Sequence, residues 1–184
     1  MSNTFPRTRR SKRGYTIAEV EDFLQEARTA YTSQSASYGG LDAKTIRTIA
    51  FSFQKGGYST AHVDAALERL EDAFATRERE RAFAQPGGDA AWYGEARSTA
   101  QVILDRLDRD YGKRFTRVGA LSTGYNVRDV DALADRLADY FQKGAPLSVD
   151  EVRTAVFRSA NGGYQETQVD VLLDTVVGVM LAVR

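Results

Sequence analysis

Side chains that could do acid–base or metal chemistry are sparse in this sequence of 184 residues. His62 is its one histidine, and it has no cysteine. A zinc site needs several nitrogen or sulfur ligands, and thiolate catalysis needs a cysteine, so the sequence predicts neither. Asp64 could orient the His62 ring, but no nucleophile lies in register with the two. We therefore expect His62 to be an exposed polar residue.

Carboxylates and glycines give no better candidate for catalysis. Asp105, Asp108 and Asp110 do not converge on one point of a helix, so we interpret them as a solvated face. The glycine doublets 56–57 and 162–163 lack the spacing of a phosphate-binding loop and predict turns. The sequence thus predicts no catalytic, cofactor or metal site, and a protein that is not an enzyme.

Basic residues are concentrated at the N-terminus, although the whole chain balances 25 basic against 25 acidic residues. Such an arm could be a solvated terminus, bind an anionic membrane, grip nucleic-acid phosphates or contact a protein partner. A second basic-aromatic cluster begins at Lys113. The candidate contact residues of the two clusters are Phe5, Arg7, Arg9, Arg10, Lys12, Arg13, Lys113, Arg114, Phe115 and Arg117.

A motif that recurs four times must position these clusters. It consists of Gly-Tyr, four residues, Val and an acidic residue, followed by a helix pattern. The motif residues are Gly14, Tyr15 and Val20; Gly57, Tyr58 and Val63; Gly124, Tyr125 and Val130; and Gly163, Tyr164 and Val169. A recurrence at about 40 residues within each pair indicates an internal repeat.

The four copies also form two pairs. Residues 41–63 match residues 147–169 at an offset of 106, and the first copy matches the third at an offset of 110. We therefore predict a first repeat pair over residues 1–84, a linker over 85–94, and a second repeat pair with a bridging helix over 95–184.

Each motif predicts the start of a helix after a tight turn. Thr16, Ser59 and Asn126 are good N-caps, whereas Gln165 is a poor one. The Tyr and the Val have the spacing of a hydrophobic staple. Capping boxes are predicted at Thr16 with Glu19 and at Ser148 with Glu151.

Apolar periodicity predicts helices after each motif, shorter helices at 43–54 and 149–160, and a bridging helix at 95–111. The final stretch, 171–183, is apolar on nearly all sides and should be buried in its own core or in a homodimer contact. No strand pattern is evident. The predicted fold is all-α: two similar halves in a pseudo-two-fold relation, built from helix-turn-helix units that each open with a Gly-Tyr turn.

Two further features have alternative interpretations. Trp92 and Tyr93 could seal the two halves together or anchor a partner, and the core role is favoured. Arg47 and Arg153 occupy matching repeat positions. They could face a shared groove or, preferably, pair with the acid that follows Val in the next helix.

Residues 13–24, Arg-Gly-Tyr-Thr-Ile-Ala-Glu-Val-Glu-Asp-Phe-Leu, resemble the signature of the N-terminal domain of the DivIVA family of bacterial cell-division and pole-organising proteins. The other three copies are weaker versions of it. In that family an exposed Phe-Arg pair before Gly-Tyr touches the membrane. Arg13 matches the Arg, but Lys12 stands where the Phe would be.

The resemblance implies a scaffold for cell division or polar growth, with protein partners from the division machinery. The expected location is the cytoplasm, with peripheral contact to the inner face of the cell membrane through the basic N-terminus. The alternative is a nucleic-acid-binding regulator that uses the same arm, with nucleic acid the less favoured partner of the two.

Overall fold

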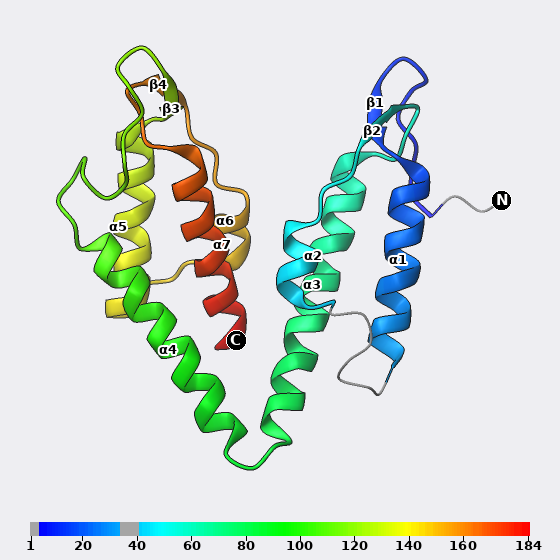
Figure 1. Cartoon of the computed structure of the whole chain (residues 1–184), viewed down its shortest axis with the longest axis horizontal. Helices are drawn as coiled ribbons and strands as arrows, with labels where there is room; N and C mark the ends of the chain where they lie inside the picture. Colours follow the sequence, from blue (N-terminus) through cyan, green and yellow to red (C-terminus); the bar gives the residue numbers. More distant parts are fainter. Residues whose placement is uncertain (1–3, 34–40) are drawn as a thin grey trace. The chain divides into compact units, whose positions relative to one another are not determined.

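The computed structural model describes residues 4–33 and 41–184, and this part of the chain is mostly helical (Figure 1). The chain divides into two compact units, which are Met1–Arg81 (unit 1) and Ala82–Arg184 (unit 2). The mostly helical fold confirms the predicted class in its main feature. The pseudo-two-fold relation between the halves stays a prediction.

The described part of unit 1 contains two short strands and three helices. They follow the order β1 (Arg13–Tyr15), α1 (Ile17–Thr32), α2 (Ala43–Thr48), β2 (Phe53–Lys55) and α3 (Thr60–Phe83), the last of which ends just inside unit 2. Strands β1 and β2 are antiparallel, with Arg13 opposite Lys55 and Tyr15 opposite Phe53. The core consists of buried side chains from these helices and from Tyr58, which lies between β2 and α3: Val20, Phe23, Ala27, Ile46, Tyr58, Val63 and Phe74.

Unit 2 begins with α4 (Gly88–Leu107), which contacts α5 and α7. The remaining elements are β3 (Thr123–Tyr125), α5 (Val127–Lys143), α6 (Val149–Arg153), β4 (Ser159–Asn161) and α7 (Glu166–Ala182). Strands β3 and β4 are antiparallel, with Gly124 opposite Ala160. One core cluster consists of Phe115, Val130, Tyr164 and Val169.

The four strands differ from the sequence prediction, which contained none. The helices expected over 43–54 and 149–160 end at Thr48 and Arg153, and the chain then runs extended into β2 and β4. Strands of three residues are too short for an apolar alternation to show in the sequence. Their pairing depends instead on a partner about 40 residues away.

The bridging helix also differs from its expected bounds of 95–111. Helix α4 already starts at Gly88, inside the predicted linker 85–94, and ends at Leu107. Gly87 at its N-cap has φ 70°, a left-handed conformation that glycine adopts without strain. The turn between α3 and α4 is therefore only a few residues long.

The helix caps confirm two predictions and correct a third. Asn126 accepts hydrogen bonds from the backbone N–H groups of Arg128 and Asp129, and the Ser148 capping box is present. The expected box at Thr16 is wrong, because its hydroxyl donates to the carbonyl of Ser52 over 3.0 Å and gives no cap.

The predicted partner of Thr16 also binds Ser52. The Glu19 carboxylate accepts from the Ser52 N–H at 2.7 Å. Both groups thus fasten the start of α1 to the chain before β2. Gln165 caps nothing, in agreement with its poor cap chemistry.

Helix α7 is buried within unit 2, which confirms the expectation of a buried C-terminal helix. Val176, Val177 and Met180 are at most 3% exposed, and α4 and α6 contact this helix. Trp92 Nε1 donates to the Ala182 carbonyl over 2.9 Å, so this side chain ties α4 to the end of α7. No helix in the described ranges, 4–33 and 41–184, has the length and apolarity to span a bilayer.

Candidate interaction site

The Gly-Tyr turns meet in pairs, and in unit 1 the first copy crosses the second. Tyr15 and Tyr58 exchange backbone hydrogen bonds, each N–H donating to the other carbonyl at 3.0 Å. A Cβ on Gly14 would lie 2.2 Å from the Tyr58 carbonyl oxygen, and one on Gly57 would lie 2.3 Å from that of Tyr15. Only glycine fits at either position, because real Cβ atoms do not approach so closely.

Unit 2 contains the same crossing between the third and fourth copies. The backbone groups of Tyr125 and Tyr164 exchange hydrogen bonds of 3.0 and 2.8 Å. A Cβ on Gly124 or Gly163 would lie 2.2 or 2.4 Å from a tyrosine carbonyl of the other copy. The glycine of the motif thus serves close backbone approach as well as the turn predicted from sequence.

The acidic residue of each motif binds the tyrosine of the paired copy. In unit 1 the Tyr58 hydroxyl donates to Glu21, and Tyr15 is hydrogen-bonded to Asp64. The Tyr164 hydroxyl in unit 2 lies 3.0 Å from Asp131 Oδ1. The fourth pair, in the same unit, joins Tyr125 to Asp170. All four copies therefore share one reciprocal tyrosine–carboxylate contact.

These contacts correct the predicted role of Arg47. The acid after Val in the next helix is Asp64, but that carboxylate binds Tyr15. Arg47 Nε donates to Glu71 Oε1 at 2.6 Å, two turns further along α3, and both side chains are largely buried. The side chain of Arg153 lies 3.4 Å from Asp150 of its own helix.

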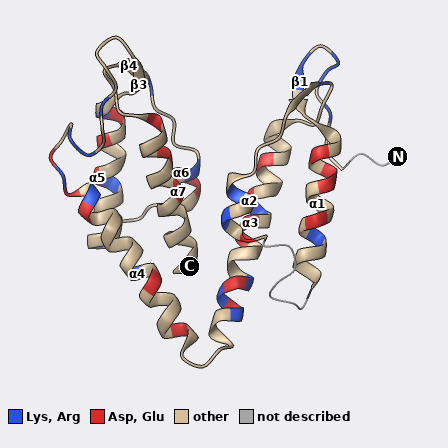
Figure 2. Ribbon diagram, viewed as in Figure 1, with Lys and Arg blue, Asp and Glu red and all other residues tan. Residues whose placement is uncertain are grey.

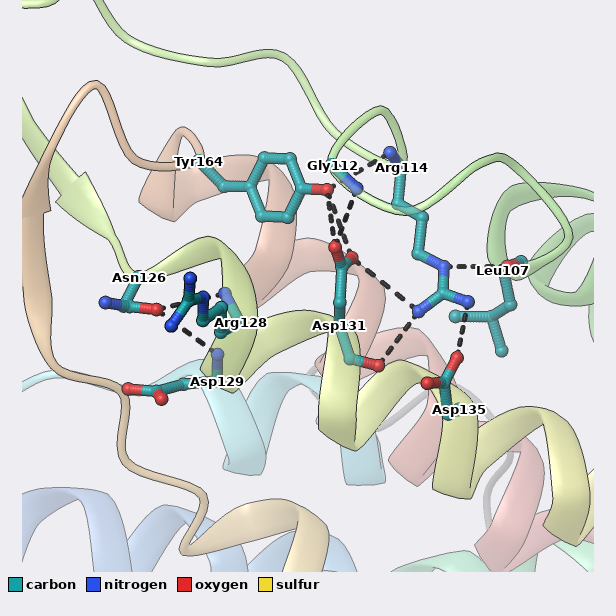
Figure 3. Close-up of polar contacts among 9 residues, drawn as sticks. All are labelled: Leu107, Gly112, Arg114, Asn126, Arg128, Asp129, Asp131, Asp135 and Tyr164. Carbon is teal, nitrogen blue, oxygen red and sulfur yellow. Dashed lines mark hydrogen bonds and ion pairs between the residues drawn. The ribbon is translucent and has the colours of Figure 1, made fainter.

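A buried polar network surrounds the crossing of unit 2 (Figure 3). Arg114 donates from Nε to the Leu107 carbonyl at 2.9 Å and from Nη1 to the Asp131 carbonyl at 2.8 Å. Its Nη2 lies 2.5 Å from Asp135. Burial, then the charge of Asp131, raise the pKa of Tyr164 to about 12. The network joins α4, α5 and the fourth Gly-Tyr turn.

This arrangement differs from the exposed second basic cluster expected from sequence. Arg114 is 8% exposed because it takes part in the buried ion network, and Phe115 is 5% exposed because it packs in the core. Arg117 is tied to the Gly162 carbonyl through Nε at 2.7 Å. Lys113 remains on the surface and pairs with Asp110 at 2.9 Å.

Phe5 and Phe115 lie under the paired turns. The Phe5 ring meets Tyr58 edge-on with centroids 5.4 Å apart, and Phe115 meets Tyr164 in the same way at 5.2 Å. Phe5 is half-buried. Phe5 therefore packs against the crossing of the two turns. The sequence had instead predicted that Phe5 contacts a membrane or a partner at the surface.

The basic N-terminal segment is held in place from Thr4 onward. Thr8 N–H donates to the Gly57 carbonyl at 2.8 Å, and Ser59 N–H donates to Pro6 at 2.9 Å. A β-turn follows, closed by Lys12 N–H to the Arg9 carbonyl at 2.8 Å. The described part of the arm is thus part of the fold.

This β-turn and the adjacent strand ends carry a group of cations that we call the basic tip (Figure 2). It consists of the exposed residues Arg9, Arg10, Lys12, Arg13 and Lys55. Arg13 and Lys55 lie directly opposite each other in the β1–β2 register, an arrangement in which like charges destabilise a sheet. In the described ranges, none of the five makes an ion pair or a side-chain hydrogen bond.

The corresponding turn of unit 2 has the same backbone and no charge, and we call it the neutral tip. The Ser122 N–H donates to the Gly119 carbonyl at 2.9 Å and closes the turn. The Gly162 N–H donates to the Ser122 carbonyl at 2.9 Å. Thr123 faces Asn161 across the strands, and Leu121 at the apex is 97% exposed. The turn therefore forms without cations.

The basic tip is the part of the chain best suited to bind something else, and its chemistry is that of anion binding. Arg7 lies beside it, exposed and bridged to Tyr58. His62 is exposed, as expected, with Nδ1 3.0 Å from the Ser59 hydroxyl. Sequence reasoning found four of the five tip residues but missed Lys55, because only the strand register brings it to the turn.

Comparison with known proteins gives a partial similarity to a bacterial effector protein. No family model matches the chain, and no solved structure matches it. The effector protein BopA of Burkholderia pseudomallei (strain K96243) is 33% identical over 110 residues, covering 55% of this chain and 21% of BopA. BopA of Burkholderia mallei (strain ATCC 23344) gives the same values. The chain thus spans about a fifth of the length of the curated relatives that it matches.

Proposed function

We propose that this chain is a non-enzymatic interaction protein that docks on an anionic membrane surface through the basic tip. The observation that carries the proposal is the contrast between the two tips. The neutral tip forms the same hydrogen-bonded turn with uncharged residues at the five equivalent positions, so the turn does not need the five cations of the basic tip. Their mutual repulsion costs stability that an external anionic surface would offset.

The shape of the tip supports a surface as the ligand. The cations lie on one turn and on the strand ends next to it, so they are gathered at one end of unit 1. Basic residues near an anionic bilayer contribute about 1 kcal/mol each. Four or five of them give a reversible attachment without an inserted helix, and Lys12 supplies charge where the resembled family has an inserting Phe.

We further propose that the two units are duplicates, each a pair of Gly-Tyr units. The matching offsets of 106 and 110, the paired crossings and the four tyrosine–carboxylate contacts support this. After duplication, one tip became basic and the other neutral. The membrane-facing role can then belong to unit 1 alone.

The resemblance to DivIVA proteins supports a role in bacterial cell division or polar growth, with protein partners from the division machinery. In this proposal the basic tip brings the protein to the inner face of the cell membrane. The rest of the surface is then free to hold those partners as a scaffold.

The test is co-sedimentation of the protein with vesicles that contain anionic lipid or only neutral lipid. Replacing Arg9, Arg10, Lys12 and Arg13 by Gln should weaken binding to the anionic vesicles by at least 100-fold, on the basis of about 1 kcal/mol per cation. Neutral vesicles should bind neither form.

A matched control removes four exposed cations from helices: Arg28, Lys44, Arg69 and Arg97, each to Gln. This variant has the same net charge as the tip variant and should keep nearly all of the vesicle affinity. Equal losses of vesicle affinity in the two variants would show that net charge alone determines binding, which would contradict the proposal. Tighter binding to duplex DNA than to anionic vesicles at equal salt would favour the nucleic-acid alternative.

A further inference from the structure

We propose that Ser11 is a phosphorylation site and that its modification releases the basic tip from an anionic membrane. The inference rests on the proposed function, because it assigns the regulation of the same tip. Ser11 carries the hydroxyl group that lies among these cations in sequence.

Ser11 lies at the apex of the turn from Arg9 to Lys12, and it is exposed. The nearby hydroxyls are engaged elsewhere. Thr4 donates to Glu21 at 2.9 Å, and Thr8 donates to the Lys12 carbonyl at 3.1 Å. In the described part of the chain, the Ser11 side chain makes no hydrogen bond. Its oxygen is therefore the reachable nucleophile of this segment.

Basic side chains flank this hydroxyl on both sides in sequence and across the strands. Arg9 and Arg10 precede it, Lys12 and Arg13 follow it, and Lys55 lies opposite Arg13. Kinases select substrates by the charge pattern around the acceptor. This pattern fits a serine/threonine kinase whose substrate groove is acidic.

The reaction is phosphoryl transfer from ATP in the kinase active site. The Ser11 Oγ–P bond forms as the bond from the γ-phosphorus to the β–γ bridging oxygen breaks. The hydroxyl proton passes to the general base of the kinase, and ADP leaves.

The product places a charge of about −1.5 to −2 at the centre of the basic tip. Arg10 and Lys12 are its sequence neighbours and can hold the phosphate as charge-assisted partners. The net charge of the basic tip then falls from about +5 to about +3. At about one kilocalorie per mole for each charge, vesicle affinity should drop by about 10- to 30-fold.

The neutral tip offers an internal control. Ser122 is an exposed serine on the same kind of turn, next to Leu121 and Thr123, without cations beside it in sequence. A kinase that requires basic neighbours should leave it unmodified. The two serines thus separate the effect of the charges from that of an accessible turn.

The experiment treats the full chain with ATP and a basophilic serine/threonine kinase, and maps the product by mass spectrometry. The purified phosphoprotein is then compared with untreated protein in co-sedimentation with anionic vesicles. We expect modification at Ser11 and none at Ser122, with the stated loss of binding. Ser11→Ala should bind like the untreated protein and should keep its affinity after kinase treatment.

Three results would overturn the inference. The first is a folded chain left unmodified while an unfolded peptide of residues 5–17 is phosphorylated, because the turn would then shield Ser11. The second is phosphorylated protein that binds vesicles as tightly as before, which would leave the proposed function intact. The third is untreated protein that does not bind vesicles at all, which would remove the proposed function together with its regulation.

Discussion

At the residue scale, the tyrosine–carboxylate contacts explain why the motif ends in an acid. Each tyrosine hydroxyl is placed against a carboxylate of the paired copy, and burial with the nearby negative charge raises the pKa of Tyr15, Tyr58, Tyr125 and Tyr164. The hydroxyl donates while the tyrosine is neutral. A tyrosinate beside a carboxylate would replace a hydrogen bond by repulsion.

Tyr164 gives a pH prediction with a defined sign. Its folded-state pKa of about 12 lies above the ordinary value of 10.0, so its contribution to stability is complete below pH 10 and is lost as the pH rises towards 12. The unfolding free energy, measured with urea by circular dichroism, should therefore fall over this interval. In Tyr164→Phe that fall should be shallower.

At neutral pH the same substitution should destabilise the protein by about 1–3 kcal/mol, because the buried Asp131 loses a donor. Tyr111, which is 58% exposed, gives the control. Tyr111→Phe should leave the stability at neutral pH unchanged. An unchanged slope in Tyr164→Phe would show that the Tyr164 hydroxyl does not titrate as described.

At the element scale, the glycine crossings hold each short strand pair and thereby set where the following helices begin. Gly124→Ala would drive a methyl group to 2.2 Å from the Tyr164 carbonyl, and backbone atoms cannot yield as a flexible side chain could. We expect a loss of about 3 kcal/mol or more in the unfolding free energy, measured by chemical denaturation.

Gly94 provides the matched control in the same unit. It lies within α4, and a Cβ there would meet nothing within 4 Å. Gly94→Ala should therefore be neutral or stabilising by up to about 1 kcal/mol. Similar losses in the two variants would contradict the assignment of Gly124 to close backbone approach.

The sequence was sufficient for those elements whose signals are local. Helix α5 and its Asn126 cap, the Ser148 box and the burial of α7 follow from periodicity and cap chemistry. The strands did not, because their stability comes from pairing across some 40 residues. For the same reason, the sequence did not reveal which tyrosine each motif carboxylate contacts.

For the candidate site, the charged residues could be predicted from the sequence, but their burial and their neighbours could not. Arg9, Arg10, Lys12 and Arg13 lie within five consecutive residues, so the sequence alone shows the cluster. Lys55 needed the strand register, and the burial of Arg114 needed the positions of Leu107 and Asp131. A run of basic residues shows charge, whereas only the fold decides which of them face the solvent.

At the scale of the whole molecule, a chain with no net charge carries its cations unevenly. Attraction to an anionic surface through one tip should therefore be strongly sensitive to salt. The Debye length shortens from about 30 Å at 0.01 M to about 8 Å at 0.15 M ionic strength. Vesicle affinity measured by co-sedimentation should fall steeply over this range.

The four-Gln variant of the basic tip should show little of this salt dependence, because the charges that feel the surface are gone. The control with four helix cations replaced should follow the unmodified protein. A salt dependence that is the same in all three proteins would place the binding surface outside the basic tip.

The shared turn has a practical consequence for engineering. Because residues 9–13 and 119–123 follow one hydrogen-bonded path with unlike side chains, the turn works as an interchangeable display cassette. A five-residue sequence moved from one site to the other, or a short recognition sequence from another protein, should be presented in the same conformation. The crossing glycines beneath it, Gly14 with Gly57 and Gly124 with Gly163, are the fixed frame of that cassette.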